Sequence, residues 1–384
     1  MEFALRRAAL AAFAGIGLLL AGCGSDDAST AEIWPTHGWQ VESPEDHGMD
    51  AAVLEGAREY AFQEGKYTQG VVVVRGGVIV AEWYEDGRDA TSFGTSWSVA
   101  KSFTSALIGI AIGEGLIDGV DTPMAEFFPQ WRGTDKETIT LRHVLSMESG
   151  LEWDEDYSPT HVSNIIQMIV LEEDHLSYAA AQPLQVPPGT RFSYSSGDTM
   201  LFSGVLEAAT GGRAGEYARE KLLDPIGMDP VDWWRDGTGH TVTYCCLDTP
   251  TRQFAKFGLL YLRGGRWEGR QVVPADWVEA STTPNGVYQG YGYQWWLTGR
   301  SNPELPADLF SARGHDGQYI YVIPSLDLVV VRNGHYDKYP GEPMADPTLW
   351  VLIPSDGFIE GKGSIPPDSW SDTEFLGPIL RSIR

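Results

Sequence analysis

The sequence is poor in cysteine and in basic residues, and both shortages argue against whole classes of protein. Its 384 residues include three cysteines, and 27 lysines and arginines against 53 acidic residues, for a formal net charge of −26 at pH 7. Two of the cysteines, Cys245 and Cys246, are neighbours that cannot reach ordinary disulfide geometry without strain, so we expect small buried hydrophobic side chains and no disulfide framework. The acidic balance argues against nucleic acid, whose phosphates the protein would repel, and against docking on anionic lipid through a basic patch.

Two motifs are also missing. No Gly-x-Ser-x-Gly sequence occurs, which argues against the nucleophile elbow of an α/β-hydrolase. The eight histidines show no metal-ligand spacing such as His-x-x-x-His with an acidic partner, so we expect no metal and no other cofactor. What the chain does have is 42% hydrophobic residues, with 14 Trp, 16 Tyr and 14 Phe, enough to bury a large core.

Residues 1–22 have the pattern of a bacterial signal peptide. Arg6 and Arg7 precede an apolar stretch at 8–20 that is too short to span a membrane comfortably. The next residues, Leu20-Ala21-Gly22-Cys23, resemble the lipobox of bacterial lipoproteins. That resemblance implies cleavage before Cys23, lipidation of its sulfur, and a lipid-anchored protein on the periplasmic or extracellular side of the bacterial cell envelope. An ordinary secretory signal with an incidental cysteine is the alternative.

Strand patterns lie toward both ends of the chain and helix patterns lie between them. Runs of β-branched and aromatic residues predict strands at 69–75, 78–84, 291–297, 309–313, 318–323 and 328–333, with Gly76-Gly77 as a hairpin turn. Apolar residues at helical spacing predict helices at 49–64, 140–147, 163–172, 199–210, 215–223, 250–263 and 274–281. This order predicts an α+β fold, in which an antiparallel sheet flanked by helices is built from both termini and carries an inserted, mainly helical lobe.

The same patterns divide the chain into segments. Residues 23–43 are predicted to be an acidic, flexible tether, and 44–356 one domain with its helical lobe at about 120–247. Residues 357–384 are rich in Gly, Pro and Ser and are predicted to be an irregular tail. We expect the active cleft between the sheet and the helical lobe, where pockets commonly form.

The sequence Trp97-Ser98-Val99-Ala100-Lys101-Ser102 opens a further apolar helical run. The chain has only seven lysines, and Lys101 alone has a serine three residues before it. On a helix, positions i and i+3 share a face, so the side chains of Ser98 and Lys101 can meet in one cleft. A buried lysine can lose its proton near neutral pH and act as a base toward a hydroxyl. The alternative is a helix-capping serine and a solvated lysine.

Two later motifs can complete such a site. In Phe192-Ser193-Tyr194-Ser195-Ser196-Gly197, Tyr194 can place its phenol over the nucleophile, and Lys101 can stabilise a phenolate. In Arg313-Gly314-His315-Asp316-Gly317-Gln318, a glycine at the start of a strand lets substrate approach the backbone. The backbone amides of Ser98 and Gln318 are predicted to form the oxyanion hole.

In this order, Ser-x-x-Lys, Tyr-x-Ser and His-x-Gly resemble the motifs of the serine β-lactamase and penicillin-binding protein superfamily. The class C β-lactamase-related branch, which includes family VIII carboxylesterases, D-amino-acid peptidases and 6-aminohexanoate-dimer hydrolases, is the most similar. The likeness covers about residues 44–353, including the phrases at 141–147 and 254–261. It implies a β-lactamase/transpeptidase-like fold and a catalytic Ser98, Lys101 and Tyr194. The segment Asp154-Glu155-Asp156-Tyr157 is similar to the 6-aminohexanoate-dimer hydrolases, which implies that Tyr157 contacts substrate, although packing is the alternative for this side chain.

The sequence departs from this pattern at two positions. Ser196 stands where β-lactamases of this branch usually carry Asn, and His315 stands where they and the DD-peptidases usually carry Lys. That lysine helps to hold a substrate carboxylate in those enzymes. A histidine is mostly neutral at pH 7, and Asp316 beside it adds negative charge, so carboxylate recognition should be weaker here.

The sequence therefore predicts an exported serine hydrolase that cleaves carboxylic esters or linear amides through an acyl-enzyme on Ser98. Lys101 and Tyr194 would share the general-base work, and Tyr157, Ser196, His315 and Gly317 would contact substrate. The expected partners are a small ester or amide and, through the lipid at Cys23 alone, a membrane; the sequence does not predict an oligomeric state. Two alternatives stay open: a β-lactamase or D-alanyl-D-alanine carboxypeptidase, and a catalytically idle envelope lipoprotein that binds peptides.

Overall fold

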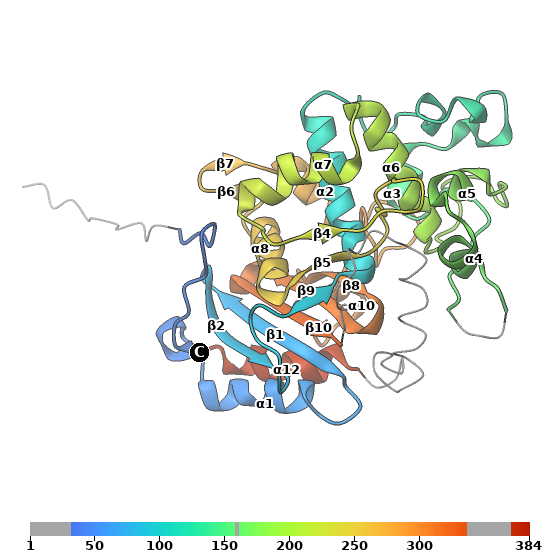
Figure 1. Ribbon diagram of the computed structural model, residues 1–384. Coiled ribbons are helices and arrows are strands. Elements are labelled where there is room, and N and C mark those ends of the chain that lie inside the picture. Colours follow the sequence, from blue (N-terminus) through green and yellow to red (C-terminus); the bar gives the residue numbers. More distant parts are fainter. Residues whose placement is uncertain (1–31, 158–160, 336–369) are drawn as a thin grey trace, which may run out of the picture. The chain divides into compact units, whose positions relative to one another are not determined.

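The computed structural model describes residues 32–157, 161–335 and 370–384 (Figure 1). The predicted signal peptide, Cys23 and the first part of the predicted tether lie outside these residues. The contacts group Ile33–Arg384 into one compact unit. Within the described ranges, no helix has both the length and the apolar character needed to cross a membrane.

A five-stranded antiparallel sheet, in the order β2-β1-β10-β9-β8, forms the centre of this unit. Its strands are β1 (Thr68–Arg75), β2 (Val78–Tyr84), β8 (Phe310–Gly314), β9 (Gln318–Ile323) and β10 (Leu328–Gly334). The register places Val73 of β1 opposite Ala81 of β2 and Val330 of β10. The amino-terminal hairpin and the three carboxy-terminal strands thus share one sheet, which confirms the α+β fold predicted from the sequence.

The valine run of β1 is buried on both faces of the sheet, and alternate residues serve two different cores. Val71 and Val73 pack with Leu54 of α1 (Ala51–Ala61) and Phe375 of α12 (Asp372–Ser382). Val72 and Val74 face the opposite core, in which α8 (Thr251–Leu262) lies against the sheet. Figure 1 shows α1 and α12 together beneath the sheet and α8 above it. Because a strand alternates its side chains, one continuous apolar run fills two layers.

The inserted lobe is mainly helical, as predicted, and lies at the upper right of Figure 1. It follows α2 (Ala100–Gly113), the buried helix that begins beside the predicted nucleophile. Its helices are α3 (Leu141–Leu145), α4 (Asn164–Leu171), α5 (His175–Ala181), α6 (Ser196–Thr210) and α7 (Ala214–Ala218). Two short helices, α9 (Ala275–Ser281) and α10 (Thr298–Ser301), come between the lobe and β8.

A second, small sheet connects the lobe to the segment before the nucleophile. It has the order β3-β5-β4, with β3 (Phe93–Thr95), β4 (Asp232–Trp233) and β5 (Leu247–Pro250). A two-stranded ribbon of β6 (Arg266–Trp267) and β7 (Arg270–Gln271) follows α8. The strand predicted at 291–297 is absent; this segment makes only isolated bridges, such as Trp296 with Ser311. Its aromatic residues Tyr291, Tyr293 and Trp295 are buried by packing, which a β-propensity pattern cannot distinguish from a strand.

Described residues of the predicted tether and of the predicted irregular tail pack on the body of the domain. In the predicted tether, Trp34 packs against Trp267 with 5.1 Å between ring centroids, and Val41 forms a parallel bridge with Ile79. In the predicted irregular tail, α12 buries Phe375, Leu376 and Ile379 completely against the sheet. Apolar contact, which composition does not report, therefore extends the domain at both ends.

Cys245 and Cys246 are 3% and 0% exposed, so their predicted burial is correct. The structure nevertheless joins the two sulfurs in a disulfide, which the sequence analysis did not expect. The pair follows Tyr244 in the segment that leads into β5.

Candidate active site

The predicted nucleophile lies at a sharp change of direction in the backbone. Ser98 is in a 3₁₀ turn (Trp97–Val99) that runs directly into α2, and Trp97 before it has a φ of 43°. This left-handed conformation is uncommon outside glycine and is found mostly where surrounding structure enforces it, often at functional sites. The turn presents Ser98 at the start of α2, and its own hydrogen bonds run from the Val99 N–H to the Ser96 carbonyl oxygen and from the Ala100 N–H to the Trp97 carbonyl oxygen.

Lys101 is 1% exposed and directs its amine toward Ser98. Its Nζ lies 3.0 Å from Ser98 Oγ, 3.0 Å from Ser196 Oγ and 3.0 Å from the carbonyl oxygen of Tyr244. Burial lowers the pKa of Lys101 to about 8, although the negative charge of Glu155 opposes this shift. A substantial fraction of the amine is therefore neutral near pH 8 and can accept a proton from the serine hydroxyl.

Tyr194 reaches the same two residues from the loop before α6. Lys101 Nζ lies 5.0 Å from the centroid of its ring, and its phenol shares a hydrogen bond with Ser98. Burial raises the pKa of Tyr194 well above its ordinary value, and the charge of Glu155 raises it further, while the bond with Ser98 acts in the opposite direction. The phenol therefore stays protonated at neutral pH and is suited to donate a proton rather than to act as a base.

The end of β8 approaches the nucleophile closely. A Cβ on Gly314 would lie 2.5 Å from the backbone oxygen of Ser96 and 3.0 Å from Trp97 Cβ, so only glycine fits without a shift. His315 follows, with its ring 5.5 Å from that of Trp97 and 5.1 Å from that of Tyr157. Burial lowers the pKa of His315, which keeps the imidazole neutral at pH 7 as the sequence analysis expected.

Two predicted residues of the third motif are directed elsewhere. The backbone N–H of Gln318 donates to the carbonyl oxygen of His315, and its side-chain oxygen accepts a bond from Asn333. The carbonyl oxygen of Gly317 accepts a bond of 2.7 Å from Arg332. Neither residue lines the cavity at Ser98, so the structure does not bring the predicted Gln318 donor or the predicted Gly317 contact to the substrate space.

Ser196 and Tyr157 are near the nucleophile but differ in their surroundings. Ser196, the first residue of α6, is fully buried and bonds to Lys101, so it contacts the base rather than the cavity. Tyr157 is 37% exposed and lines the cavity, where its hydroxyl donates to Glu155 Oε1 at 3.0 Å.

Glu155 is the site residue that the sequence analysis missed. Its Oε1 accepts from Ser196 Oγ at 2.5 Å and its Oε2 from the Ser196 amide at 2.9 Å. In the sequence, the segment 154–157 points to Tyr157 through its resemblance, and its adjacent acidic residues give no reason to choose Glu155 over Asp154 or Asp156. The contact with Ser196 that identifies Glu155 is visible only in the folded structure, where a lobe loop meets the start of α6.

A cavity of ≈ 350 Å³ opens at Ser98 and brings the three motifs together. Its lining comes from the nucleophile turn, the Glu155 loop, the Tyr194 loop and the β8–β9 region: Ser98, Glu155, Tyr157, Tyr194, Trp296, Arg313, Gly314, His315 and Tyr319. The one cationic side chain in this lining, Arg313, is paired with Asp372 of α12 at 2.8 Å. The cavity therefore offers little unpaired positive charge to a carboxylate.

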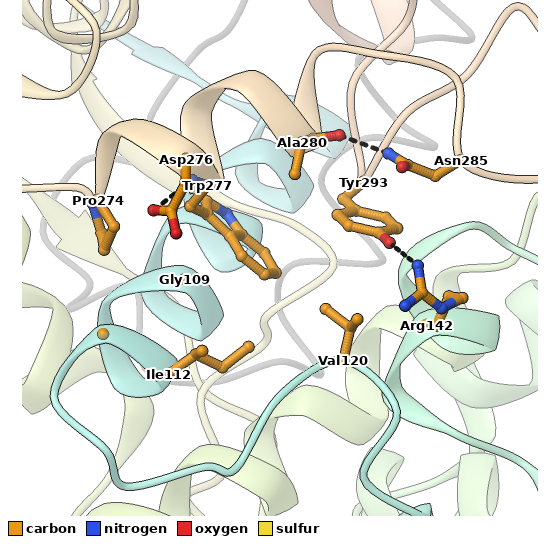
Figure 2. A pocket seen from close by; sticks show the side chains of 11 residues that line it. Gly109, Ile112, Val120, Arg142, Pro274, Asp276, Trp277, Ala280, Asn285 and Tyr293 are labelled. Atoms are coloured by element: carbon orange, nitrogen blue, oxygen red, sulfur yellow. Dashed lines mark hydrogen bonds between the residues drawn. The ribbon is translucent and has the colours of Figure 1, made fainter.

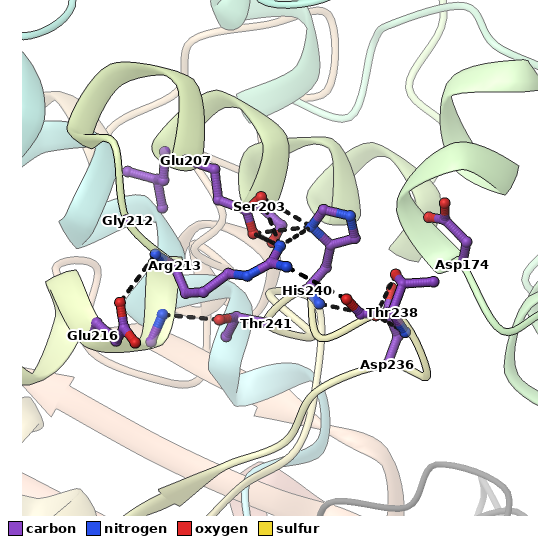
Figure 3. A network of polar contacts seen from close by, with 12 residues as sticks. Asp174, Ser203, Glu207, Gly212, Arg213, Glu216, Asp236, Thr238, His240 and Thr241 are labelled. Atoms are coloured by element: carbon purple, nitrogen blue, oxygen red, sulfur yellow. Dashed lines mark hydrogen bonds and ion pairs between the residues drawn. The ribbon is translucent and has the colours of Figure 1, made fainter.

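A polar network surrounds the turn at 236–240, which comes shortly before Tyr244 in the chain (Figure 3). Glu207 of α6 accepts from Arg213 and contacts His240 Nδ1, each at 2.9 Å. Asp236 accepts from the backbone of His240 at 2.9 Å and from the backbone of His175 at 3.1 Å. These contacts tie the turn at 236–240 to α6 and to the start of α5, which supports the position of the nearby Tyr244 carbonyl that binds Lys101.

A second cavity of ≈ 370 Å³ lies near the far end of α2, about three helical turns from Ser98 (Figure 2). Its cationic residue, Arg142, bonds to Asp121 at 2.8 Å and to the hydroxyl of Tyr293 at 2.6 Å. Trp277 packs directly on Gly109 of α2, where a Cβ would come within 2.2 Å of the indole. The guanidinium of Arg142 is thus already engaged by Asp121 and Tyr293. In the described part of the chain, no cluster of three His, Cys, Asp or Glu side chains is placed to hold a metal ion.

The beta-lactamase family profile matches residues 58–351 of the chain. The chain belongs to the beta-lactamase family. The chain is 27% identical over 290 residues to a 6-aminohexanoate-dimer hydrolase of Paenarthrobacter ureafaciens, an alignment covering 69% of this chain and 72% of that one. It is 29% identical over 300 residues to the esterase/beta-lactamase LipL of Mycobacterium tuberculosis, covering 72% and 66%.

The fold is similar to that of solved members of this family. A Bacillus anthracis protein assigned as a 6-aminohexanoate-dimer hydrolase superposes with a TM-score of 0.64 at 21% identity, covering 85% of this chain and 86% of that one. The family membership and the fold confirm the resemblance stated from the sequence motifs, and they establish the chain as a serine hydrolase of the beta-lactamase family.

Proposed function

We propose that the chain cleaves carboxylic esters or linear amides through an acyl-enzyme on Ser98. The observation that carries this proposal is the amine of Lys101, almost fully buried, with its pKa lowered to about 8 and its Nζ 3.0 Å from Ser98 Oγ. The names of the relatives, a 6-aminohexanoate-dimer hydrolase and an esterase/beta-lactamase, support the same pair of substrate classes.

In the proposed mechanism, neutral Lys101 removes the proton of Ser98 as Oγ attacks the substrate carbonyl carbon. The tetrahedral intermediate then collapses, the bond to the leaving group breaks, and Tyr194 donates its phenolic proton to that group. The proton held by Lys101 replaces the one that Tyr194 has lost. Water next attacks the acyl-enzyme, gives its proton back through the same groups, and releases the carboxylic acid with Ser98 restored.

The oxyanion of the intermediate needs at least two donors aimed at one point. We retain the backbone amide of Ser98 as the first. For the second we replace Gln318 by the backbone at Gly314–His315, because these residues line the cavity and Gly314 lies against the nucleophile turn. The second oxyanion donor thus still comes from the third motif, but from its first glycine, at the end of β8.

The charges around the cavity favour a neutral substrate. Glu155 contributes a carboxylate, His315 is neutral at pH 7, and Arg313 is paired with Asp372. A β-lactam or a D-alanyl peptide carries a carboxylate that this lining would attract poorly. We therefore place β-lactamase or D-alanyl-D-alanine carboxypeptidase activity second to ester or amide cleavage.

Covalent labelling tests the proposal. Purified protein from residue 25 onward is incubated with a fluorophosphonate, and the intact mass and the labelled peptide are measured. The proposal expects one adduct on Ser98 in the parent protein and its loss in Lys101→Ala. No adduct and no turnover of any ester would instead favour the idle envelope lipoprotein that binds peptides.

We also propose that the protein is exported and lipid-anchored at Cys23, because residues 20–23 resemble a lipobox. The mature amino terminus is the direct test. Expression of the full chain in a bacterial host should give a protein that begins at a lipidated Cys23 and partitions with membranes. Cys23→Ser should release the protein from membranes; an unchanged distribution would contradict the anchor.

A further inference from the structure

The carboxylate of Glu155, like the amine of Lys101, lies close to the nucleophile: it lines the same cavity as Ser98. It does not touch Ser98; instead the buried hydroxyl of Ser196 lies between it and Lys101. We propose that Glu155 is a positioning residue that acts through Ser196 to direct the lone pair of Lys101 at Ser98. This inference rests on the proposed acyl-enzyme function.

The hydroxyl of Ser196 has one proton, and the structure commits it to Glu155. Ser196 Oγ lies 2.5 Å from Glu155 Oε1 and 3.0 Å from Lys101 Nζ. A carboxylate can only accept hydrogen bonds, so the proton of Ser196 must be directed at Glu155. The Ser196 oxygen is left as an acceptor, and Lys101 must be the donor in the contact between them.

The other contacts of Lys101 are fixed in the same way. The Tyr244 carbonyl oxygen, 3.0 Å from Nζ, can only accept. A neutral amine has two protons and one lone pair, and both protons are used by Ser196 and Tyr244. The lone pair of Nζ then faces its third neighbour, Ser98 Oγ at 3.0 Å, which is the arrangement that a base requires.

Without Glu155 this direction would be lost. Ser196 could then turn its own proton toward Lys101, and the amine could accept from Ser196 while donating to Ser98. The lone pair of Lys101 Nζ would then face Ser196 instead of Ser98 in a fraction of the molecules, and those molecules could not deprotonate Ser98. The carboxylate thus selects one of two hydrogen-bond arrangements, without touching the substrate carbonyl.

The contacts of Glu155 argue for this role over direct binding of a cationic substrate group. Oε1 accepts from the hydroxyls of Ser196 and Tyr157, and Oε2 accepts from the Ser196 amide and from Trp153 Nε1 at 2.5 Å. Trp153 is itself held against the start of α6, where Gly197 leaves room for its ring. Four donors hold the carboxylate in place, as expected of a rigid positioning group.

The test compares four variants by their pH profiles of kcat/KM on p-nitrophenyl butyrate. Glu155→Gln removes the charge and keeps the size of the side chain. Glu155→Asp keeps the charge but withdraws it by one methylene from Ser196. Asp156→Asn is the matched control, because it removes the neighbouring charge, whose carboxylate lies 3.7 Å from His161 and on the exposed side of the loop. Ser196→Ala removes the hydroxyl between Glu155 and Lys101.

In Glu155→Gln the amide nitrogen faces two donors whichever oxygen it replaces, so the side chain cannot keep its place. The plateau at high pH should therefore fall by about 10-fold or more, within the range that a general base contributes. The same variant should move the acid limb to lower pH, because the charge of Glu155 raises the pKa of Lys101. Glu155→Asp should lower the plateau with a much smaller movement of the limb, and Asp156→Asn should change neither.

A double-mutant cycle isolates the route through Ser196. If Glu155 acts on the plateau through that hydroxyl, Glu155→Gln should cost little further plateau activity in a Ser196→Ala background. Additive losses would overturn the inference, as would a Glu155→Gln profile that matches Asp156→Asn. If Glu155→Gln fails to fold, judged by circular dichroism, Glu155→Asp and Ser196→Ala still decide the question, since each must lower the plateau.

Failure of this inference is distinguishable from failure of the proposed function. Fluorophosphonate labelling of Ser98 in the parent protein reports on the function, whichever way the Glu155 variants behave. A parent protein that is labelled and active, with Glu155 variants equal to the control, would reject the positioning role alone.

Discussion

Lys101 Nζ and Ser98 Oγ are 3.0 Å apart, and the amine is almost completely buried among groups that accept its protons. The 3₁₀ turn that carries Ser98 runs directly into α2, which carries Lys101, and this continuous helical path brings residues three apart onto one face. The surrounding lobe supplies the low polarity that lowers the pKa of the amine. Local sequence thus sets the distance between the amine and the hydroxyl, and tertiary packing sets the pKa of the amine.

The pH dependence of kcat/KM should reflect the titration of Lys101. Its pKa is lowered to about 8, and the neutral form is the base, so activity should be low below this pH and should rise to a plateau above it. The acid limb measured on a neutral ester, whose own ionisation does not intervene, should have its midpoint near 8. A limb near the ordinary pKa of histidine would point to a different base.

Tyr194→Phe should discriminate between leaving groups. The phenol stays protonated because burial raises its pKa, and it is placed to protonate the departing atom. An alkyl ester or amide needs that proton, whereas p-nitrophenolate leaves readily without it. The variant should therefore lose about 100-fold or more in kcat on an alkyl ester and much less on a p-nitrophenyl ester. Equal losses on both would assign Tyr194 to another step.

A pair of substrates that differ in one carboxylate tests the charge of the cavity. p-Nitrophenyl butyrate and mono-p-nitrophenyl succinate have acyl chains of the same length, and only the second is anionic. With the acidic side chain of Glu155 in the lining and His315 neutral, kcat/KM should be at least about 10-fold higher for the butyrate. Nitrocefin, which also carries a carboxylate, should be turned over slowly. Fast nitrocefin cleavage would revive the β-lactamase alternative.

The carboxy-terminal helix should contribute to stability without entering the site. Phe375 of α12 is fully buried between α1 and the sheet, so Phe375→Ala should lower the free energy of unfolding by about 3–5 kcal/mol. Glu374→Ala, on the exposed side of the same helix, should change it by about 0.5 kcal/mol or less. Urea unfolding measures both. Equal effects would mean that α12 does not pack on the sheet in solution.

The sheet was predictable because its sequence is locally unambiguous. The valine run of β1, the Gly76-Gly77 turn and β2 lie within one or two residues of their predicted positions, as do β8, β9 and β10. The tail helix was not predicted, because Gly377 and Pro378 inside α12 hide an apolar face that has the right spacing. Propensity there gives way to burial of Phe375 and its neighbours.

The site was predictable in its first two motifs and less so in its third. Ser98 and Lys101 are fixed by helical spacing, but the third motif contains Gly314 and Gly317, and no local pattern says which one lies against the nucleophile. Only the packing of β8 on the turn at Trp97 selects Gly314. Glu155 could not be predicted for a similar reason, because its contact with Ser196 joins a loop to the start of α6, 41 residues away in the chain.

The intact mass of the labelled protein is the sharpest test of Ser98 as a nucleophile activated by Lys101. After a brief incubation with a fluorophosphonate, we expect one adduct per chain, located on the peptide that contains Ser98. The adduct should be absent in Ser98→Ala and strongly slowed in Lys101→Ala at pH 8, with circular dichroism showing that both variants remain folded. An adduct on another residue, or labelling of Ser98 at the same rate without the Lys101 amine, would contradict the account.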